Sequence, residues 1–368
     1  MKFRRVLGWS VVAILLALFA AVSFAYWKSD NLCPDPEAAP TGDLMKAIVY
    51  CDYGSAEVIR FQDIEKPTPA DDEVLVKVRA AGVNPLDSHY MRGTPYIMRM
   101  ESGLRKPMIT RLGVDFAGTI EAVGTGVTRF KPGDEVFGGR TGAYAEYLTV
   151  RQDRSVVLKP ANLEFEQAGT VAIAAITALQ GLRDKGQVQP GHKVLINGAS
   201  GGVGTFAVQI AKTFGAEVTG VCSTRNVELV RSLGADHVID YTQENFTEGD
   251  QQYDLILDMV GNHPLLDLRR VLTPEGKMVI IGGPKTGKWL GPMIRPVKAM
   301  ILSPFIEQEF SMLMASLNQR DLNFLAELME SGQVRPVIDR RYSLGEVPEA
   351  IRYLEQGHAR GKVVITLE

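Results

Sequence analysis

The residues with the clearest chemical potential form a glycine-rich turn at residues 197–204. An apolar run at residues 194–196 precedes the turn, and a segment with helical periodicity follows it. In a strand–turn–helix of this kind, glycines let a pyrophosphate approach the backbone, and the helix N-terminus offers it unpaired N–H groups. The turn therefore predicts a dinucleotide site, with seven contributing residues: Gly198, Ala199, Ser200, Gly201, Gly202, Val203 and Gly204.

The same segment resembles the signature of the quinone oxidoreductases and zeta-crystallins, zinc-free members of the medium-chain dehydrogenase/reductase superfamily. The matching positions are Gly191, Leu195, residues 199–202, Gly204, Gln209 and Lys212. The resemblance runs from about Met45 to Glu368, except for a stretch after Tyr96. It implies an α/β fold, with a GroES-like β-rich catalytic domain and a Rossmann domain whose parallel sheet is doubly wound.

The hydrophobic pattern predicts the elements that position the turn. Strands are expected at residues 46–50, 73–78, 113–123 and 134–150, then helices at 163–182, 202–214, 226–233 and 265–272 alternating with strands at 193–197, 217–222, 238–240, 253–260 and 277–282. Alternating strands and helices indicate a parallel sheet covered on both faces. The expected domains are a catalytic domain at residues 45–162, a Rossmann NADP-binding domain at 163–305 and a return to the catalytic domain at 306–368.

The choice of cofactor depends on the end of the second Rossmann strand, where an NAD site carries a carboxylate. Residues 221–226 contain no carboxylate. Ser223 can donate a hydrogen bond and Arg225 can pair with a 2′-phosphate, so NADPH is the expected cofactor. The alternative for Arg225 is a solvated residue that opens the next helix.

Three further cofactor contacts are expected. The resemblance implies Thr177 beside the nicotinamide ribose and Tyr241 near the adenosine, although Thr242 stands where relatives usually carry a lysine or arginine. Gly282 would permit close approach to the nicotinamide, and the alternative for it is an ordinary turn.

Catalytic support is expected from the loop at residues 84–96. Relatives begin this loop with an asparagine, which Asn84 matches, and carry tyrosines over the nicotinamide; the first aligns with His89 or Tyr90 and the second with Tyr96. An imidazole at His89 could supply a proton near neutral pH. The alternatives are a surface or hydrogen-bonded histidine at His89 and a turn residue before proline at Asn84.

Residue types also argue against zinc. Zinc-dependent relatives carry ligands at places that here read Gly-Val-Asn-Pro-Leu-Asp (residues 82–87) and Gly-Val-Asp (residues 113–115), and Val114 cannot bind a metal. Without a Lewis acid, hydride transfer suits an acceptor that delocalises its own charge, which means a quinone or an α,β-unsaturated carbonyl. The alternatives are a non-catalytic NADPH-binding protein and an alcohol or aldehyde dehydrogenase.

The N-terminus predicts a single-pass membrane anchor. Residues 6–27 carry no charge, and as a helix they would span ~33 Å, enough for a bilayer core. Lys2, Arg4 and Arg5 precede this run, so the positive-inside rule places the enzyme on the far side from the cytoplasm. That placement conflicts with the mainly cytosolic supply of NADPH, and a signal peptide cleaved near residues 23–25 is the alternative. Residues 28–44 are expected to form a proline-containing tether.

Composition and the remaining segments narrow the partners. A net charge of −3 over 368 residues gives no electrostatic case for nucleic acid. Cys33, Cys51 and Cys222 are expected to be unrelated thiols, with a Cys33–Cys51 bridge in an oxidising compartment as the alternative. Residues 99–111 are expected to rim the pocket. Residues 287–305 are expected to form a dimer contact or cover the pocket, with a membrane surface as the alternative. The resemblance also implies a possible homodimer.

Overall fold

The computed structural model describes Cys33 and residues 42–283, 287, 289, 291–302 and 306–367. The predicted anchor at residues 1–27 and most of the predicted tether therefore lie outside the described residues. Within the part of the chain that is described, no helix is both long and apolar enough to cross a membrane.

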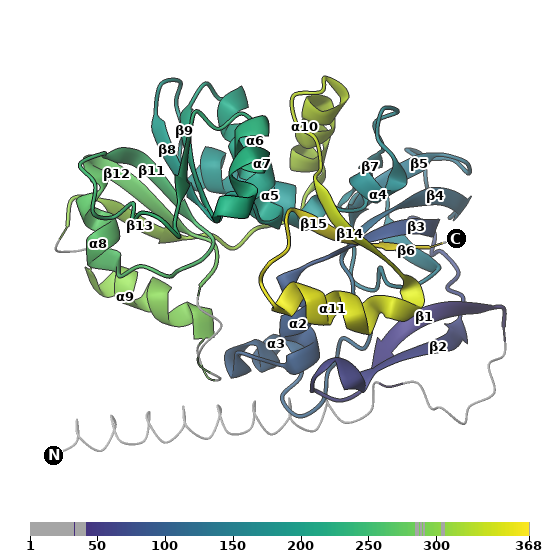
Figure 1. Ribbon diagram of the computed structural model, residues 1–368. Coiled ribbons are helices and arrows are strands. Elements are labelled where there is room, and N and C mark those ends of the chain that lie inside the picture. The colour runs from purple at the N-terminus through teal and green to yellow at the C-terminus, as the bar shows by residue number, and fades with distance from the viewer. Residues whose placement is uncertain are drawn as a thin grey trace, which may run out of the picture.

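The β-rich domain is built around a seven-stranded sheet in the order β14-β15-β3-β4-β5-β7, with β6 paired to β3 (Figure 1). Its strands are β3 (Glu73–Val83), β4 (Asp115–Val123), β5 (Glu135–Gly139), β6 (Tyr147–Arg151), β7 (Val156–Leu158), β14 (Ile338–Ser343) and β15 (Lys362–Thr366). Alternate valines of β3, at positions 74, 76 and 78, are buried in the domain core. The antiparallel hairpin of β1 (Leu44–Tyr50) and β2 (Ile59–Glu65) forms a separate sheet.

The second domain is a six-stranded parallel sheet in the order β10-β9-β8-β11-β12-β13. Its strands are β8 (Lys193–Asn197), β9 (Glu217–Cys222), β10 (His237–Asp240), β11 (Tyr253–Asp258), β12 (Leu272–Ile280) and β13 (Glu309–Met312). One face is covered by α5 (Ala172–Gln180), α6 (Gly202–Thr213), α7 (Val227–Ser232) and α10 (Gln319–Glu330), and the other by α8 (Leu265–Arg270) and α9 (Ile294–Leu302). The GroES-like domain and the parallel, doubly wound sheet are thus confirmed.

Three expected boundaries need correction. The return to the catalytic domain does not begin at residue 306, because β13 pairs with β12 and completes the parallel sheet. The helix expected at residues 163–182 is divided into α4 (Phe165–Ala168), α5 and a π-turn over Gly181–Lys185, since Gly169 ends the first turn. The helix expected to reach residue 272 stops at α8, because Leu272 already pairs with β11.

The expectation of three unrelated thiols is wrong. Cys33 and Cys51 form a disulfide with their Cα atoms 5.7 Å apart, because the chain at Cys33 lies beside the end of β1. Cys222 is free and buried at the end of β9, where burial raises the pKa of its thiol to about 11. A disulfide is typical of a compartment outside the reducing cytosol.

Candidate active site

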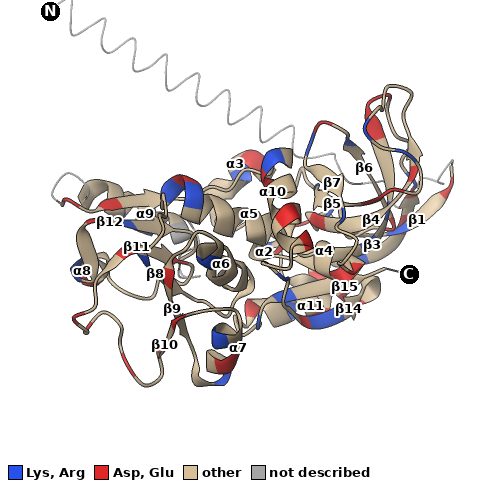
Figure 2. Cartoon of the chain, turned by 90° about the horizontal axis from the view of Figure 1, so that it is seen from above, with Lys and Arg blue, Asp and Glu red and all other residues tan. Residues whose placement is uncertain are grey.

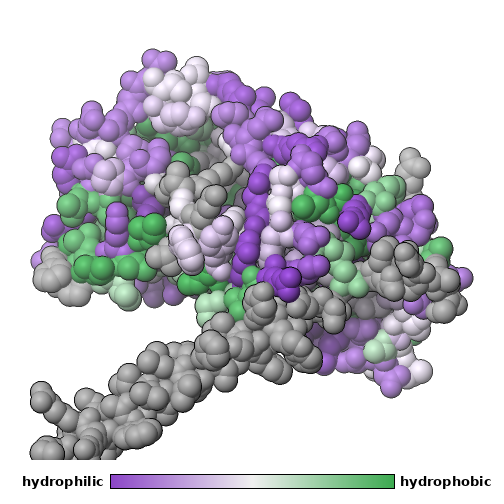
Figure 3. Space-filling view, turned by 90° about the horizontal axis from the view of Figure 1, so that it is seen from below, coloured by the Kyte–Doolittle hydropathy of each residue, from purple (hydrophilic) through white to green (hydrophobic). Residues whose placement is uncertain are grey.

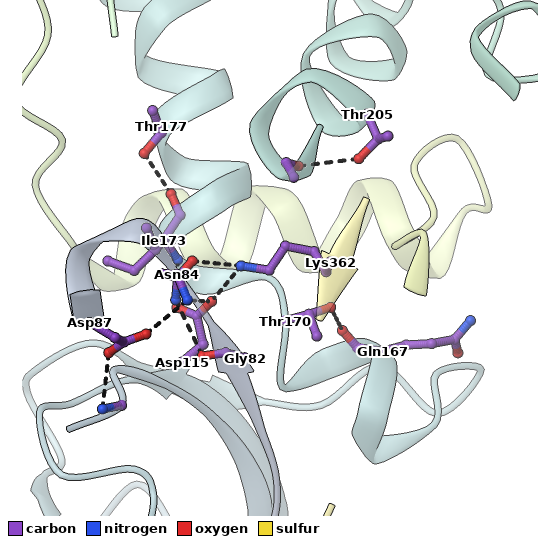
Figure 4. Close-up of polar contacts among 12 residues, drawn as sticks. Gly82, Asn84, Asp87, Asp115, Gln167, Thr170, Ile173, Thr177, Thr205 and Lys362 are labelled. Carbon is purple, nitrogen blue, oxygen red and sulfur yellow. Dashed lines mark hydrogen bonds and ion pairs between the residues drawn. The ribbon is translucent and has the colours of Figure 1, made fainter. Parts of the chain in front are cut away.

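A buried polar cluster of Asn84, Asp115 and Lys362, hereafter the interdomain cluster, lies where the two domains meet (Figure 4). Lys362 Nζ donates to Asn84 Oδ1 at 2.6 Å and to Asp115 Oδ2 at 3.3 Å. Asn84 Nδ2 donates to the same Asp115 oxygen at 3.1 Å and to the carbonyl of Gly82 at 3.3 Å. Each charge is therefore both paired and hydrogen-bonded, which is the condition for holding it in a dry interior.

The interdomain cluster also fixes the start of α5. Asp115 Oδ1 accepts the backbone N–H of Ile173 at 2.8 Å, in the first turn of that helix, where a carboxylate is favourable. Thr177 lies one turn further on and is mostly buried, and its hydroxyl donates to the carbonyl of Ile173 at 2.6 Å. Figure 4 shows Ile173 beside Asn84 and Thr177 one helical turn farther along.

The first residues of β15 connect this cluster to the glycine-rich turn. Gly361 N–H donates to the carbonyl of Ser200 at 2.9 Å, and Gly361 forms a parallel bridge with Gly201. A Cβ added to Gly202 would lie 3.1 Å from Lys362 Cδ. The predicted dinucleotide site and the interdomain cluster are therefore adjacent.

The glycine-rich turn has the geometry of a phosphate cradle. Gly198 has φ +95°, and a Cβ on Gly204 would lie 2.1 Å from the carbonyl oxygen of Gly198, so neither position accepts another residue without strain. Helix α6 begins at Gly202, and its first N–H groups have no partner within the helix. The seven residues from Gly198 to Gly204 thus form one continuous turn that leads into the start of α6.

The adenosine end of the site contains an unsatisfied acceptor. Asn226 Nδ2 donates to the hydroxyl oxygens of Ser200 and Ser223 at 3.0 and 3.2 Å, while Asn226 Oδ1 is buried with no hydrogen-bond partner among the described residues. A buried acceptor without a partner is costly, so this atom fits a hydroxyl donor from a bound ribose. Arg225 Nη2 donates to the carbonyl of His358 at 2.8 Å, which holds its guanidinium beside the loop before β15.

A carboxylate does lie at this end, but it comes from the third strand. Asp240 at the end of β10 accepts the hydroxyl of Thr224 at 2.6 Å and that of Thr242 at 2.8 Å. The Thr224 hydrogen bond, supported by the backbone and hydroxyl of Thr242, lowers the pKa of Asp240, so this carboxylate is ionised at neutral pH. Tyr241 follows it and is 56% exposed, open to stack on a bound ring.

A second buried ion pair, hereafter the strand-end pair, joins Asp258 at the end of β11 to Arg295 on α9. Arg295 Nη2 donates to Asp258 Oδ2 at 2.7 Å, and Arg295 Nη1 donates to the carbonyls of Gly261 and His263. Asp258 Oδ1 also accepts Asn197 Nδ2 at 2.9 Å. The pair holds α9 against the cofactor end of the sheet.

Gly282 lies against the strand-end loop. A Cβ on Gly282 would lie 2.2 Å from the carbonyl oxygen of Met259, so a close backbone approach requires glycine there. Gly282 follows β12, which pairs in the sheet with β11 and β13.

Helix α2 (Pro85–Arg92) begins directly after Asn84, carries His89 and is fixed at its start by Asp87, while Tyr96 lies beyond it in the short turn Tyr96–Met98. This carboxylate accepts the backbone N–H of Asn84 at 2.8 Å, the hydroxyl of Tyr144 at 2.8 Å and the backbone N–H of Gly113 at 3.0 Å. Burial raises the pKa of Asp87 to about 6, although these three hydrogen bonds oppose the shift. Asp87 therefore anchors the start of the loop.

His89 and Tyr96 occupy the far part of the same loop. His89 Nδ1 lies 2.8 Å from the carbonyl of Thr94, and because a carbonyl only accepts, the Nδ1 atom carries a proton and Nε2 is the nitrogen open to exchange. Tyr96 packs edge-on against Trp289 with ring centroids 5.3 Å apart, and the guanidinium of Arg99 lies 4.7 Å from its centroid. These contacts close the loop against residues of the Rossmann domain.

Comparison with known proteins now defines the family. A family model described as an alcohol dehydrogenase GroES-like domain matches residues 70–161, and one described as a zinc-binding dehydrogenase matches residues 233–365. A 2-methylene-furan-3-one reductase from Solanum lycopersicum is 36% identical over 336 residues, covering 87% of this chain and 79% of that protein. The quinone oxidoreductase of Homo sapiens is 33% identical, covering 88% and 98%.

The chain belongs to the quinone oxidoreductase and alkenal reductase family of the medium-chain dehydrogenases/reductases. Among solved structures, a quinone oxidoreductase from Coxiella burnetii is similar with a TM-score of 0.76 and 29% identity, covering 89% of this chain and all of that one. Some relatives are NAD(P)H-dependent oxidoreductases by name, such as a chloroplastic NADPH-dependent alkenal/one oxidoreductase of Arabidopsis thaliana that is 35% identical over 87% of this chain and 79% of its own length. A nicotinamide cofactor and small quinone or alkenal substrates are therefore established at the level of the family.

Among the described residues, no group of three or more His, Cys, Asp or Glu side chains is placed to hold a metal ion. Val114, at the position of a zinc ligand in zinc-dependent relatives, is buried just before β4.

The sequence analysis predicts no role in the site for four residues that the structure places there: Asp115, Asn226, Arg295 and Lys362. Lys362 and Arg295 each lie in an apolar stretch of the sequence. A cation in such a stretch indicates a buried ion pair, because a buried cation needs a partner. Asp115 opens a strand and Asn226 precedes a helix, positions that polar residues commonly occupy without a functional role.

Proposed function

We propose that this protein is an NADPH-dependent reductase that transfers a hydride to a quinone or an α,β-unsaturated carbonyl without zinc. One observation carries the proposal: Gly361 and Lys362 join the glycine-rich turn to Asn84 and Asp115, so the dinucleotide cradle and the substrate-side loop share one buried network. The named activities of the relatives support the substrate class.

The residues present fit the cofactor. The pyrophosphate would lie on the turn at residues 198–204, and Arg225 with Ser223 would meet the 2′-phosphate, while Asn226 Oδ1 would accept from a ribose hydroxyl. Thr177 and Gly282 would flank the nicotinamide end. When bound, NADPH supplies the hydride, and the protein supplies placement and protons.

The substrate-side residues divide into two roles in this proposal. The amide of Asn84 already serves Gly82, Asp115 and Lys362, so Asn84 acts as a positioning residue that fixes the start of α2. His89 Nε2 delivers the proton that the reduced acceptor takes up, and Tyr96 donates to the acceptor oxygen.

The test is nicotinamide oxidation by the full chain in detergent with a benzoquinone, a naphthoquinone, an alkenal, an enone and a simple aldehyde, using NADPH and NADH in parallel. We expect turnover of quinones or enones with NADPH preferred. His89→Gln and Tyr96→Phe should each lower kcat about 10²-fold while the Kd for NADPH is kept. His237→Gln is the matched control, since His237 is an exposed histidine paired with Glu217. Tight NADPH binding with no turnover would favour the non-catalytic alternative.

We also propose that residues 6–27 anchor the enzyme to a membrane as a single pass. Their length and lack of charge support it, and the Cys33–Cys51 disulfide supports the far side from the cytoplasm, where such bonds persist. Resistance of the full chain to extraction by alkaline carbonate is the expected result. Release into the supernatant would contradict the anchor, and protease access from one side would fix the orientation.

A homodimer is proposed on the resemblance, and β13 forms an open edge of the parallel sheet that a second copy could meet. Sedimentation of the detergent-solubilised full chain should give twice the chain mass of 40.3 kDa, whereas a single-chain mass would contradict the dimer.

A further inference from the structure

Large apolar side chains gather on one exposed face that both domains share. This apolar face consists of Ile97, Met100, Trp289, Val297, Met300 and Ile301. Met100 is 74% exposed, Trp289 75% and Met300 69%. Figure 3, which views the molecule from below, shows hydrophobic side chains concentrated on its left, where Figure 1 places α9. Contiguous apolar residues on a surface indicate an interaction site.

The apolar face surrounds the junction between the two domains. Ile97 lies in the short turn Tyr96–Met98 and Met100 in α3 (Arg99–Ser102), both in the β-rich domain. Trp289, from the other domain, contacts Tyr96, and its carbonyl accepts the backbone N–H of Ile97 at 3.4 Å. The face is therefore next to the loop proposed to contact substrate.

The α9 part of this face is fixed by its buried side. Arg295 and Ala299 point inward, and Arg295 is held by Asp258 at the end of β11. The neighbouring residues Val297 and Met300 consequently face outward, together with the exposed Lys298. Figure 2 shows positive charge on α9, where Lys298 is the exposed cation, and both signs of charge on α3.

The disulfide brings the N-terminal segment to the same place. Cys33 is bonded to Cys51, which directly follows β1. Two residues later, the hydroxyl of Tyr53 donates to the carbonyls of Ser102 and Gly103 at 2.9 and 2.6 Å. The guanidinium of Arg99 also stacks on the Tyr53 ring at 4.3 Å. The chain at Cys33 is thus held next to α3.

Chain length then limits how far the apolar face can be from the predicted anchor. From Trp27, the last residue of the uncharged segment, the chain to Cys33 spans at most ~20 Å when fully extended. Without the disulfide, the chain would first be fixed at Leu44, where β1 begins. The extended chain from Trp27 to Leu44 spans ~60 Å. The disulfide therefore shortens the tether about threefold.

We propose that the apolar face rests on the surface of a phospholipid bilayer, held there by the Cys33–Cys51 disulfide. This rests on the proposed anchor and deepens the proposed function, because the substrate-side loop then opens toward the membrane. The substrate class that fits is a hydrophobic quinone or enone dissolved in the bilayer.

The test places an environment-sensitive fluorophore on single cysteines in the full chain. Met100→Cys and Met300→Cys are the probes, and Leu158→Cys on β7, on the opposite side of the molecule from α3 in Figure 1, is the matched control. Cys222 is buried and the other two cysteines are bonded, so labelling is specific. The samples are vesicles of phosphatidylcholine and phosphatidylglycerol containing the full chain, with iodide as the aqueous quencher.

We expect iodide to quench the labels at Met100 and Met300 at least threefold less than the label at Leu158. Exposure in the protein alone predicts the opposite order of quenching, because Met100 and Met300 are 74% and 69% exposed and Leu158 is 56% exposed. Equal quenching at the three positions would overturn the proposal. Protection that is the same in detergent and rises with protein concentration would also overturn it, in favour of a second copy of the chain.

The disulfide is tested in the same samples. Cys33→Ser with Cys51→Ser should raise quenching at Met100 toward the value at Leu158, and unchanged quenching would overturn the clamping role. NADPH oxidation with a short-chain, water-soluble enone is measured in parallel. An absence of this NADPH oxidation would count against the proposed function. It would leave the membrane contact of the apolar face standing, because the fluorescence measurement needs no turnover.

Discussion

The interdomain cluster and the strand-end pair are both buried carboxylate–cation pairs at the cofactor end of the molecule, but they connect different things. Lys362 Nζ and Asp115 are 3.3 Å apart within the β-rich domain, and Asp115 extends the link to the Rossmann domain because it accepts the backbone N–H of Ile173 on α5. Arg295 and Asp258 are 2.7 Å apart, and both belong to the Rossmann domain.

The two pairs also differ in how much support each carboxylate retains. Asp115 has two other donors, Asn84 Nδ2 and the Ile173 N–H. Asp258 has three: Asn197 Nδ2 and the N–H groups of Val260 and Gly261. We infer that the first pair aligns the two domains for catalysis, whereas the second seats α9 and the apolar face.

Removing the cation of the interdomain cluster should have the largest effect. Lys362→Met leaves Asp115 buried without its counter-charge, which should cost about 3–5 kcal/mol of unfolding free energy. It should also lower kcat about 10²-fold, because the loop and the cradle lose their alignment. Denaturant unfolding and steady-state kinetics measure the two effects.

The control for this variant is its combination with Asp115→Asn, which removes the orphaned charge. Stability should then recover in part while kcat stays low. A double variant as unstable as the sum of the two single variants would refute the pairing.

Arg295→Met should cost less, about 3 kcal/mol, because Asp258 keeps three other hydrogen-bond donors. Turnover of a water-soluble enone should change less than about threefold, since the interdomain cluster is intact. A loss of activity equal to that of Lys362→Met would erase the distinction between the two pairs.

Asp87 is a third buried carboxylate, and it has no paired cation among the described residues. Its contribution to stability should therefore depend on pH differently from that of Asp115 or Asp258. Its folded pKa of about 6 lies above the ordinary value of 3.8, so the folded state binds the extra proton between these values. The contribution is fully present below about pH 4 and is lost as the pH rises through 6, by about 2–3 kcal/mol. The difference in unfolding free energy between wild type and Asp87→Asn should shrink by that amount from pH 4 to pH 7, and a pH-independent difference would contradict the assignment.

The smallest expected effect is at the adenosine end, outside both pairs. Arg225→Ala should raise the KM for NADPH about 10-fold and leave that for NADH unchanged, because only NADPH carries the 2′-phosphate. Arg231→Ala, an exposed arginine on α7 paired with Glu228, is the control. Equal changes for both nucleotides would remove Arg225 from the phosphate site.

The nucleotide half could be predicted because its signals are local. The glycine spacing at residues 198–204 and the alternation of strands and helices each depend on neighbours in the chain, and the structure confirms the parallel sheet. The short strand β13 was missed since four residues, Glu309–Met312, show no clear alternation.

The contacts between distant segments could not be predicted. Lys362 and Asn84 are 278 positions apart, and no periodic pattern reports that their side chains meet. The Cys33–Cys51 bond depends likewise on where the chain before β1 is placed, which composition does not reveal. The glycine-rich turn could therefore be predicted from the sequence, whereas the hydrogen bonds that join it to Asn84 and Asp115 could not.

The central claim is hydride transfer to an acceptor that delocalises charge, and isotope transfer tests it most directly. The full chain would be supplied with an enone and with NADPH carrying deuterium at the transferable C4 position, and the product analysed by NMR and mass spectrometry. The account predicts one deuterium at the β-carbon of a saturated ketone. Deuterium on the carbonyl carbon of an alcohol, or no oxidation of NADPH by either an enone or a quinone, would contradict it.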